Sequence, residues 1–188
     1  MGTETGFEIV HAVLSAEPIS VDQAIAAVES DTAGAVVSFS GVVRNHDGGK
    51  QVARLSYSAH PTAHQVMADV VARLVAEHPV PADGGTPAGG IPGSNSSARG
   101  SDSSAGGSDS GAGGADEQQQ QPVRIWAAHR IGMLEIGDPA LVCAVSAAHR
   151  GQAFAVCAEL VDRIKAQVPI WKEQFFADGT VEWVGAGE

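Results

Sequence analysis

The sequence predicts an α+β fold in which a mostly antiparallel sheet packs with two long helices, beside a small β subdomain and a long disordered insertion. Three observations support this prediction. Strand-like and helix-like segments alternate without repeated βαβ units. Hydrophobic residues make up 44% of the 188 residues, which is enough to fill a core. The composition changes abruptly in the middle of the chain, which divides a single domain into residues 1–80 and 122–188.

The predicted strands are rich in β-branched and aromatic residues and are bounded by Gly, Pro, Asn or Asp. They cover residues 7–14, 34–43, 52–58, 123–129, 140–146 and 181–184. The segment 44–49 has the residues of a tight turn, so the strand at 52–58 is expected to pair back as a hairpin. A second hairpin is expected around residues 177–179.

The helices are predicted from apolar residues that recur every three or four positions. A short helix is expected at residues 21–28, with Ser20 as its N-cap. The first long helix should have Pro61 at its N1 position and end near His78. The second long helix should end before Pro169. Its expected buried face consists of Phe154, Cys157, Leu160, Val161 and Ile164.

The insertion, residues 81–121, contains eleven glycines and eight serines but a single large aliphatic residue, Ile91. Such a segment cannot bury enough apolar surface to offset its ordering entropy, so it is predicted to be disordered. Two alternatives stay open for the insertion: a flexible segment without a role of its own, or an interaction tail.

Charge and cysteine content exclude several classes of protein. The formal net charge of −11 argues against a general nucleic-acid binder, which needs a basic face. No apolar run is long enough to span a bilayer, so no membrane association is expected. With Cys143 and Cys157 as the only cysteines, and without a signal-like start, the expected location is the reducing cytoplasm.

Two of the eleven basic residues, Lys165 and Lys172, flank a Pro169–Trp171 break at the end of the last helix. A lysine beside bulky apolar groups is a candidate base, nucleophile or anion clamp. The alternative is a pair of solvated surface lysines.

Other cations also stand at the ends of predicted elements. Arg44 follows a strand and enters a glycine-rich loop, a position suited to gripping a phosphate or carboxylate. His149 and Arg150 precede the last helix, whose N-terminus attracts anions. Sixteen residues of helix place His149 roughly 24 Å from Lys165 at about 1.5 Å per residue. Either these are two unrelated sites, or one site is assembled from two subunits.

Five motifs, in order, resemble the large catalytic subunit of molybdopterin synthase. They are Phe39-Ser-Gly41 with Val43-Arg-Asn-His46, His129-Arg-Ile-Gly132, Ser146-Ala-Ala-His-Arg150 with Ala153-Phe154, Lys165 through Pro169-Ile-Trp-Lys172, and the closing Asp178-Gly179 and Trp183-Val184. The resemblance covers both parts of the domain and leaves out the insertion. Departures occur at Ser58, His60 and Gln174, where the family usually has Glu, an aromatic residue and a carboxylate.

The resemblance implies an enzyme that converts cyclic pyranopterin monophosphate into molybdopterin by installing two sulfurs as a dithiolene. The sulfur would arrive as a thiocarboxylate on the C-terminal Gly-Gly of a ubiquitin-like small subunit. The implied assembly is a heterotetramer with a homodimer of large subunits at its centre. The implied sulfur transfer needs no metal and no cofactor. The alternative is a non-catalytic paralogue that binds the small subunit or the pterin without turnover.

The family's functional residues carry over by position. Lys165 and Lys172 match two lysines regarded as essential. Arg44, His149 and Arg150 match residues of the pterin and phosphate pocket, and the family's His-Arg pair reaches in from the other subunit. Phe39 matches an apolar residue of the pocket. These six residues are the candidate site predicted from the sequence.

Overall fold

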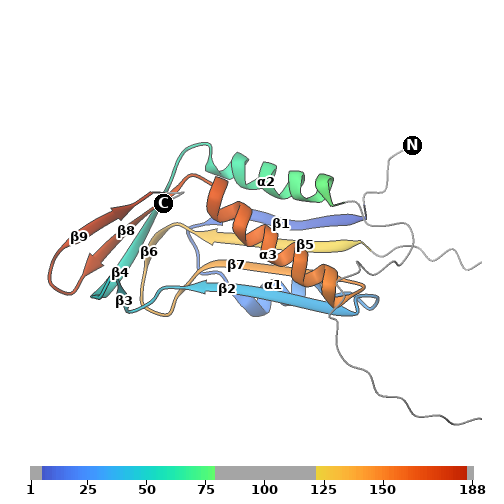
Figure 1. Ribbon diagram of the computed structural model, residues 1–188, viewed down its shortest axis with the longest axis horizontal. Coiled ribbons are helices and arrows are strands. Elements are labelled where there is room, and N and C mark those ends of the chain that lie inside the picture. The colour runs from blue at the N-terminus through green and yellow to red at the C-terminus, as the bar shows by residue number, and fades with distance from the viewer. Residues whose placement is uncertain (1–5, 79–121, 186–188) are drawn as a thin grey trace, which may run out of the picture. The chain divides into compact units, whose positions relative to one another are not determined.

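Two β-sheets organise the part of the chain that the computed structural model describes, residues 6–78 and 122–185 (Figure 1). These residues belong to one compact unit. The predicted insertion at 81–121 lies outside the described residues.

The first sheet has four strands in the order β1-β5-β7-β2. These strands are β1 (Phe7–Ser15), β2 (Ala35–Val42), β5 (Val123–Arg130) and β7 (Pro139–Ala147). β1 and β5 are parallel, whereas β5–β7 and β2–β7 are antiparallel. The second sheet is built from β3 (His46–Asp47), β4 (Lys50–Ala59), β6 (Gly132–Leu134), β8 (Ile170–Phe176) and β9 (Val181–Val184). The strand pairs in it, β3–β4, β4–β6, β4–β8 and β8–β9, are antiparallel. The predicted α+β class, with a mostly antiparallel sheet, is therefore confirmed.

Helices cover both faces of the first sheet. The two long helices, α2 (Ala63–Glu77) and α3 (Arg150–Gln167), pack on one face and contact each other. The short helix α1 (Val21–Val28) packs on the other face, against Trp126, Ala128, Val142 and Ala144. Because both faces are covered, β7 is buried from Ala140 to Ala147. This arrangement makes the first sheet the hydrophobic centre of the fold.

The predicted N-cap of α1 is confirmed. Ser20 has an extended backbone, and its hydroxyl accepts a hydrogen bond from the backbone N–H of Gln23 at 3.4 Å. This bond satisfies one of the donors that the first helical turn leaves unpaired.

The second sheet has a smaller core of its own, made from Val43, Val52, Leu55, Leu134, Ala140 and Phe176. It lies at one end of the first sheet, beside the C-terminal end of α3 (Figure 1). The chain passes from α3 into β8 within three residues, Val168 to Ile170. This short connection fixes the second sheet against the end of the helix.

The predicted hairpin exists, because β4 pairs back across the turn at Gly48 and Gly49, but its partner is β3 and not the strand at 34–43. β2 pairs with β7 over its whole length, whereas β4 pairs with β3, β6 and β8. β4 buries Val52 and Leu55 in the core of the second sheet, and pairing with β2 would remove both from it.

Two predictions about the long helices are also wrong. α2 begins at Ala63 with Thr62 as its N-cap, so Pro61 is not at N1. The backbone N–H of Ala63 bonds the carbonyl of His60 at 2.8 Å, which places a separate turn before the helix. Phe154 is 61% exposed, because the buried stripe of α3 runs through Ala153, Val156 and Cys157.

No helix in the described ranges is both long and apolar enough to cross a membrane.

Candidate active site

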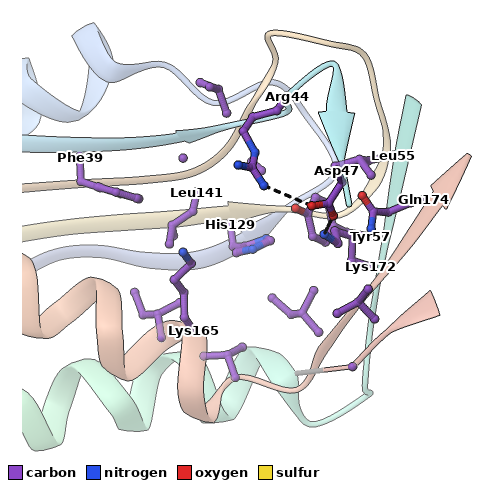
Figure 2. A pocket seen from close by; sticks show the side chains of 18 of the residues that line it. Phe39, Arg44, Asp47, Leu55, Tyr57, His129, Leu141, Lys165, Lys172 and Gln174 are labelled. Carbon is purple, nitrogen blue, oxygen red and sulfur yellow. Dashed lines mark hydrogen bonds and ion pairs between the residues drawn. The ribbon is translucent and has the colours of Figure 1, made fainter. Parts of the chain in front are cut away.

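A pocket of about 570 Å³ lies where the second sheet meets the first sheet and the end of α3 (Figure 2). Four of the six predicted site residues line it: Phe39, Arg44, Lys165 and Lys172. The other two, His149 and Arg150, do not line it, because they stand at the opposite end of α3. A single chain therefore brings four of the six predicted residues into one pocket.

Lys172 is placed by strand pairing. It lies in β8 between Tyr57 of β4 and Val184 of β9. Side chains alternate along a strand, and Lys172 lines the pocket whereas its neighbour Trp171 does not. The Lys172 ammonium donates a hydrogen bond to the Asp47 carboxylate at 3.2 Å, with the lysine side chain 25% exposed. The ammonium is thus held in a fixed position at the edge of the cavity.

Arg44 reaches the same carboxylate from the segment that follows β2. Its Nη2 lies 3.4 Å from Oδ1 of Asp47, and Lys172 binds Oδ2 (Figure 2). The pKa of the Asp47 carboxyl is held below its ordinary value, first by a hydrogen bond from Gln174 and then by one from Lys172. Asp47 therefore remains a carboxylate that spans two cations. The Arg44 side chain is 65% exposed, which leaves most of its guanidinium free to bind an anion.

Lys165 approaches the cavity from another direction. It lies in the last turn of α3, where the partial negative charge of the helix end favours a cation. Figure 2 shows its side chain extending from the helix toward Leu141. Within the described ranges, no hydrogen bond or ion pair occupies its ammonium. Ile164, one position earlier, is 1% exposed and belongs to the main core. Ile164, which is packed in the core, is therefore the sequence neighbour of Lys165, which lines the pocket.

His129 and Tyr57 form the floor of the pocket between the two lysines, a role the sequence analysis did not assign to them. Their rings meet edge to face with centroids 5.0 Å apart. Burial lowers the pKa of His129, and the nearby charge of Lys165 lowers it further. Burial also raises the pKa of Tyr57, so the phenol stays protonated. His129 begins the motif His129-Arg-Ile-Gly132 at a strand end, and this position was a signal that could have identified it.

Asp47 and Gln174 were also missed as site residues. Asp47 was interpreted only as part of a turn, and Gln174 only as a departure from the family pattern. Gln174 is 3% exposed and lies two positions after Lys172 on the same side of β8. That spacing was a signal for Gln174. No local signal pointed to Asp47, because its partner Lys172 is 125 residues away.

His149 and Arg150 are exposed at the start of α3. His149 is the N-cap residue, but its side chain makes no capping hydrogen bond. Its imidazole is therefore available to bind something outside the helix. The exposed Phe154 lies one turn further along.

The arrangement is suited to binding anions. Arg44, Lys165 and Lys172 converge on one cavity in a chain whose formal net charge is −11. Low-dielectric walls such as Phe39 and Leu141 strengthen the attraction of such cations for a charged ligand. In the described part of the chain, no three His, Cys, Asp or Glu side chains are grouped to hold a metal ion.

Comparisons with known proteins identify the family. The family model described as "MoaE protein" matches residues 14–82 and 112–167. The molybdopterin synthase catalytic subunit 1 of Mycobacterium tuberculosis is 31% identical over 173 residues, which cover 92% of this chain and 88% of that protein.

Solved structures agree with this assignment. Molybdopterin synthase from Staphylococcus aureus superposes with a TM-score of 0.62 at 27% identity, covering 96% of this chain and 97% of that one. A complex of subunits 1 and 2 of the molybdopterin-converting factor from Helicobacter pylori shares the fold, with a TM-score of 0.53 at 14% identity, covering 97% and 91%. The chain belongs to the MoaE family, the catalytic subunits of molybdopterin synthase, an enzyme of molybdenum cofactor biosynthesis.

Proposed function

We propose that this pocket transfers sulfur from a thiocarboxylated, ubiquitin-like small subunit to cyclic pyranopterin monophosphate, forming the dithiolene of molybdopterin in the cytoplasm. The observation that carries the proposal is the convergence of Arg44, Lys165 and Lys172 on one cavity. Both reactants are anionic, since one carries a phosphate and the other a thiocarboxylate. A cluster of cations in an otherwise acidic protein is the feature such reactants require.

The cyclic phosphate of the pterin is assigned to Arg44. A guanidinium presents parallel N–H donors that match phosphate oxygens, and this one is mostly exposed to the cavity. Phe39, from β2, supplies an apolar wall against which a flat ring can pack. Arg44 and Phe39 together would orient the substrate with its reacting carbons toward the lysines.

The C-terminal tail of the small subunit is assigned to the side of the pocket between Lys165 and Lys172. A Gly-Gly tail is narrow and extended, so it can enter between the ends of α3 and β8. The complex of two subunits from Helicobacter pylori, which shares this fold, supports a two-protein assembly. The affinity of the lysines for the thiocarboxylate would direct its sulfur toward the pterin.

Lys165 and Lys172 are the proposed catalytic residues. When a nucleophile adds to a carbonyl or an equivalent carbon, negative charge develops on oxygen, and a fixed ammonium stabilises it. Lys172 is already fixed by Asp47, whereas none of the described residues pairs with the ammonium of Lys165, which can therefore bind a ligand. The chemistry assigned to these groups needs no metal and no cofactor, because the sulfur enters with the partner's tail.

We further propose that the working unit is a homodimer within a heterotetramer, and that His149 and Arg150 of the second subunit complete the pocket. The 18-residue helix α3 separates them from Lys165 within one chain. His149, Arg150 and Lys165 are all exposed. Phe154, an apolar residue near the His-Arg pair, is 61% exposed, and a second subunit would cover it.

Mixing inactive variants tests this shared site. Lys165→Ala and His149→Ala chains would each be inactive alone. A random mixture would regain about a quarter of the wild-type turnover, because half of the dimers would contain one intact site of two. A mixture that stays inactive while forming dimers contradicts the shared site.

Reconstitution tests the sulfur transfer itself. The chain is mixed with a thiocarboxylated small subunit and the cyclic substrate, and the dithiolene product is measured. The matched control uses the same small subunit with an ordinary C-terminal carboxylate, which should give no product. If the thiocarboxylated partner binds but no dithiolene forms, the chain is a non-catalytic paralogue and the proposed function is wrong.

A further inference from the structure

His129 is a titratable pocket residue that the proposed chemistry has not yet used. It lies next to last in β5, with its neighbours Ala127 and Ala128 buried in the two cores of the first sheet. Its ring lines the pocket, and its Nδ1 lies 2.7 Å from the backbone carbonyl oxygen of Arg130. The ring is therefore held both by its strand and by this hydrogen bond.

The hydrogen bond determines which nitrogen carries the proton. A carbonyl oxygen can only accept, so Nδ1 must be the donor. In a neutral imidazole the other nitrogen, Nε2, then has a free lone pair. Since the Nδ1 edge is turned toward the main chain, Nε2 is the nitrogen available to the cavity. His129 thus offers a basic nitrogen in the pocket on which Arg44, Lys165 and Lys172 converge.

The surroundings keep this imidazole neutral. The groups that face the same cavity are Lys165 from α3, Lys172 from β8, Tyr57 from β4, Asp47 and His46 from β3, and Arg44 after β2. Asp47 is already paired with Lys172 and Arg44, so its charge does not favour an imidazolium. Burial, together with the charge of Lys165, outweighs the hydrogen bond to Arg130 and lowers the pKa of His129 from its ordinary value, which leaves the ring unprotonated at neutral pH.

We propose that His129 is a further catalytic residue, and that its Nε2 takes a proton from the water that releases the small subunit's tail. This inference rests on the proposed sulfur transfer. When a thiocarboxylate delivers its sulfur, the acyl carbon stays bonded to that sulfur until another atom replaces it. Water is the available replacement, and the tail then leaves as an ordinary carboxylate.

The oxygen of water bonds to the acyl carbon while Nε2 of His129 accepts one of its protons. The carbonyl electrons move onto oxygen, where the Lys165 ammonium stabilises the charge. The carbon–sulfur bond then breaks, and its electron pair leaves with the sulfur as a pterin thiolate. The new carboxylic acid loses its proton to solvent, and so does the imidazolium. No oxidant or reductant is needed.

His129→Asn tests the role of Nε2. The asparagine amide can still donate to the carbonyl of Arg130, but it has no basic nitrogen. The matched control is His64→Gln on the exposed face of α2. In a single turnover we expect product formation to slow by about 10²- to 10⁴-fold in His129→Asn, with an adduct linking tail and pterin through sulfur detected by intact mass. The control should react as the wild type does.

The pH profile separates catalysis from positioning. In the wild type, turnover should fall at acid pH as His129 becomes protonated and can no longer accept a proton, and because burial lowers the pKa of His129 this decline should lie on the acid side of an ordinary histidine. His129→Asn should lack this decline. A variant that forms no adduct and keeps the wild-type rate overturns the inference, and so does one that changes only KM. If the wild type itself makes no dithiolene, the proposed function fails, whereas an active wild type and an equally active variant remove His129 alone.

Discussion

The two sheets differ in what their side chains do. The interior of the first sheet is mostly apolar, and β7 is buried from Ala140 to Ala147 between helices on both faces. The second sheet has a small core, and it supplies Lys172, Asp47 and Gln174 to the pocket. The difference indicates that the first sheet and its helices provide stability, while the second sheet positions charge.

The end of α3 joins these two roles. Ile164 is packed in the main core, and Lys165 beside it faces the pocket. Charged groups are costly to bury, so a site with several cations is expected at the margin of a core and not inside it. Because Ile164 anchors the end of α3 in the core, the backbone that carries Lys165 is nevertheless held in place. The comparison predicts that core variants lose stability and that pocket variants lose activity.

Leu160→Ala tests the first half of this comparison and should have the largest effect. Leu160 lies on the buried face of α3 and is fully buried in the main core. Its truncation leaves a cavity and should lower the free energy of unfolding by about 2–5 kcal/mol, as measured by urea denaturation. Turnover per folded molecule should remain close to that of the wild type. A loss of turnover without a loss of stability would contradict the division of roles.

Lys172→Ala tests the second half. Removing its ammonium should lower turnover by about 10²- to 10³-fold, because oxyanion stabilisation is lost. The thermal midpoint should change little, since the Lys172–Asp47 pair is partly exposed and such pairs contribute little to stability. A stable variant with wild-type turnover would remove Lys172 from the mechanism.

Gly34→Ala should have a smaller effect, confined to the edge of the first sheet. A Cβ at Gly34 would lie 2.3 Å from the carbonyl oxygen of Ala148, so the backbone would have to shift. We expect a loss of about 1–3 kcal/mol in unfolding free energy.

Gly151→Ala is the matched control for Gly34→Ala. It lies in the first turn of α3, and an added Cβ meets nothing within 4 Å. Alanine also restricts the unfolded chain, so this variant should be as stable as the wild type or more stable, by up to about 1 kcal/mol. If both alanine variants were equally stable, the close approach at Gly34 would be refuted.

Acid pH should have the smallest effect on stability. Burial lowers the pKa of His129 in the folded state, so the unfolded chain binds more protons below 6.5 and stability falls as the pH drops past that value. Asp47, whose pKa is also lowered, adds a second loss as the pH falls below 3.8. Unfolding free energies of His129→Asn measured across this range should lack the first decline. A decline of the same size in the variant would assign it to another group.

Much of the fold follows from local patterns in the sequence. The strands β1, β2, β4, β5, β7 and β9, the helices, the Ser20 cap and the end of α3 before Pro169 were predicted from nearby residues, whereas no range was predicted for β3, β6 or β8. The strand at 34–43 is not the hairpin partner of the strand at 52–58, because strand pairing is decided by burial across the whole sheet. Whether β4 joins β2 or β8 depends on residues more than a hundred positions away.

The candidate site divides in the same way. The cations could be predicted because basic residues are scarce and stand at the ends of elements. Asp47 and Tyr57 could not be assigned to the site, since their roles depend on the register that brings β3, β4 and β8 together. His129 had a usable signal in its motif at a strand end. The family pattern pointed to groups that touch reactants, whereas Asp47 acts through Lys172 and Arg44.

The most direct test of the account compares two lysines in the reconstituted sulfur-transfer assay. Lys165 faces the pocket, whereas Lys50 pairs with Glu182 on the second sheet and does not line the pocket. Dithiolene formation is measured for Lys165→Ala and Lys50→Ala, with partner binding and thermal midpoint recorded for each. The account predicts a loss of about 10²-fold or more for Lys165→Ala, with the fold intact, and near wild-type turnover for Lys50→Ala. Equal turnover in the two variants would contradict the claim that this pocket is the site of catalysis.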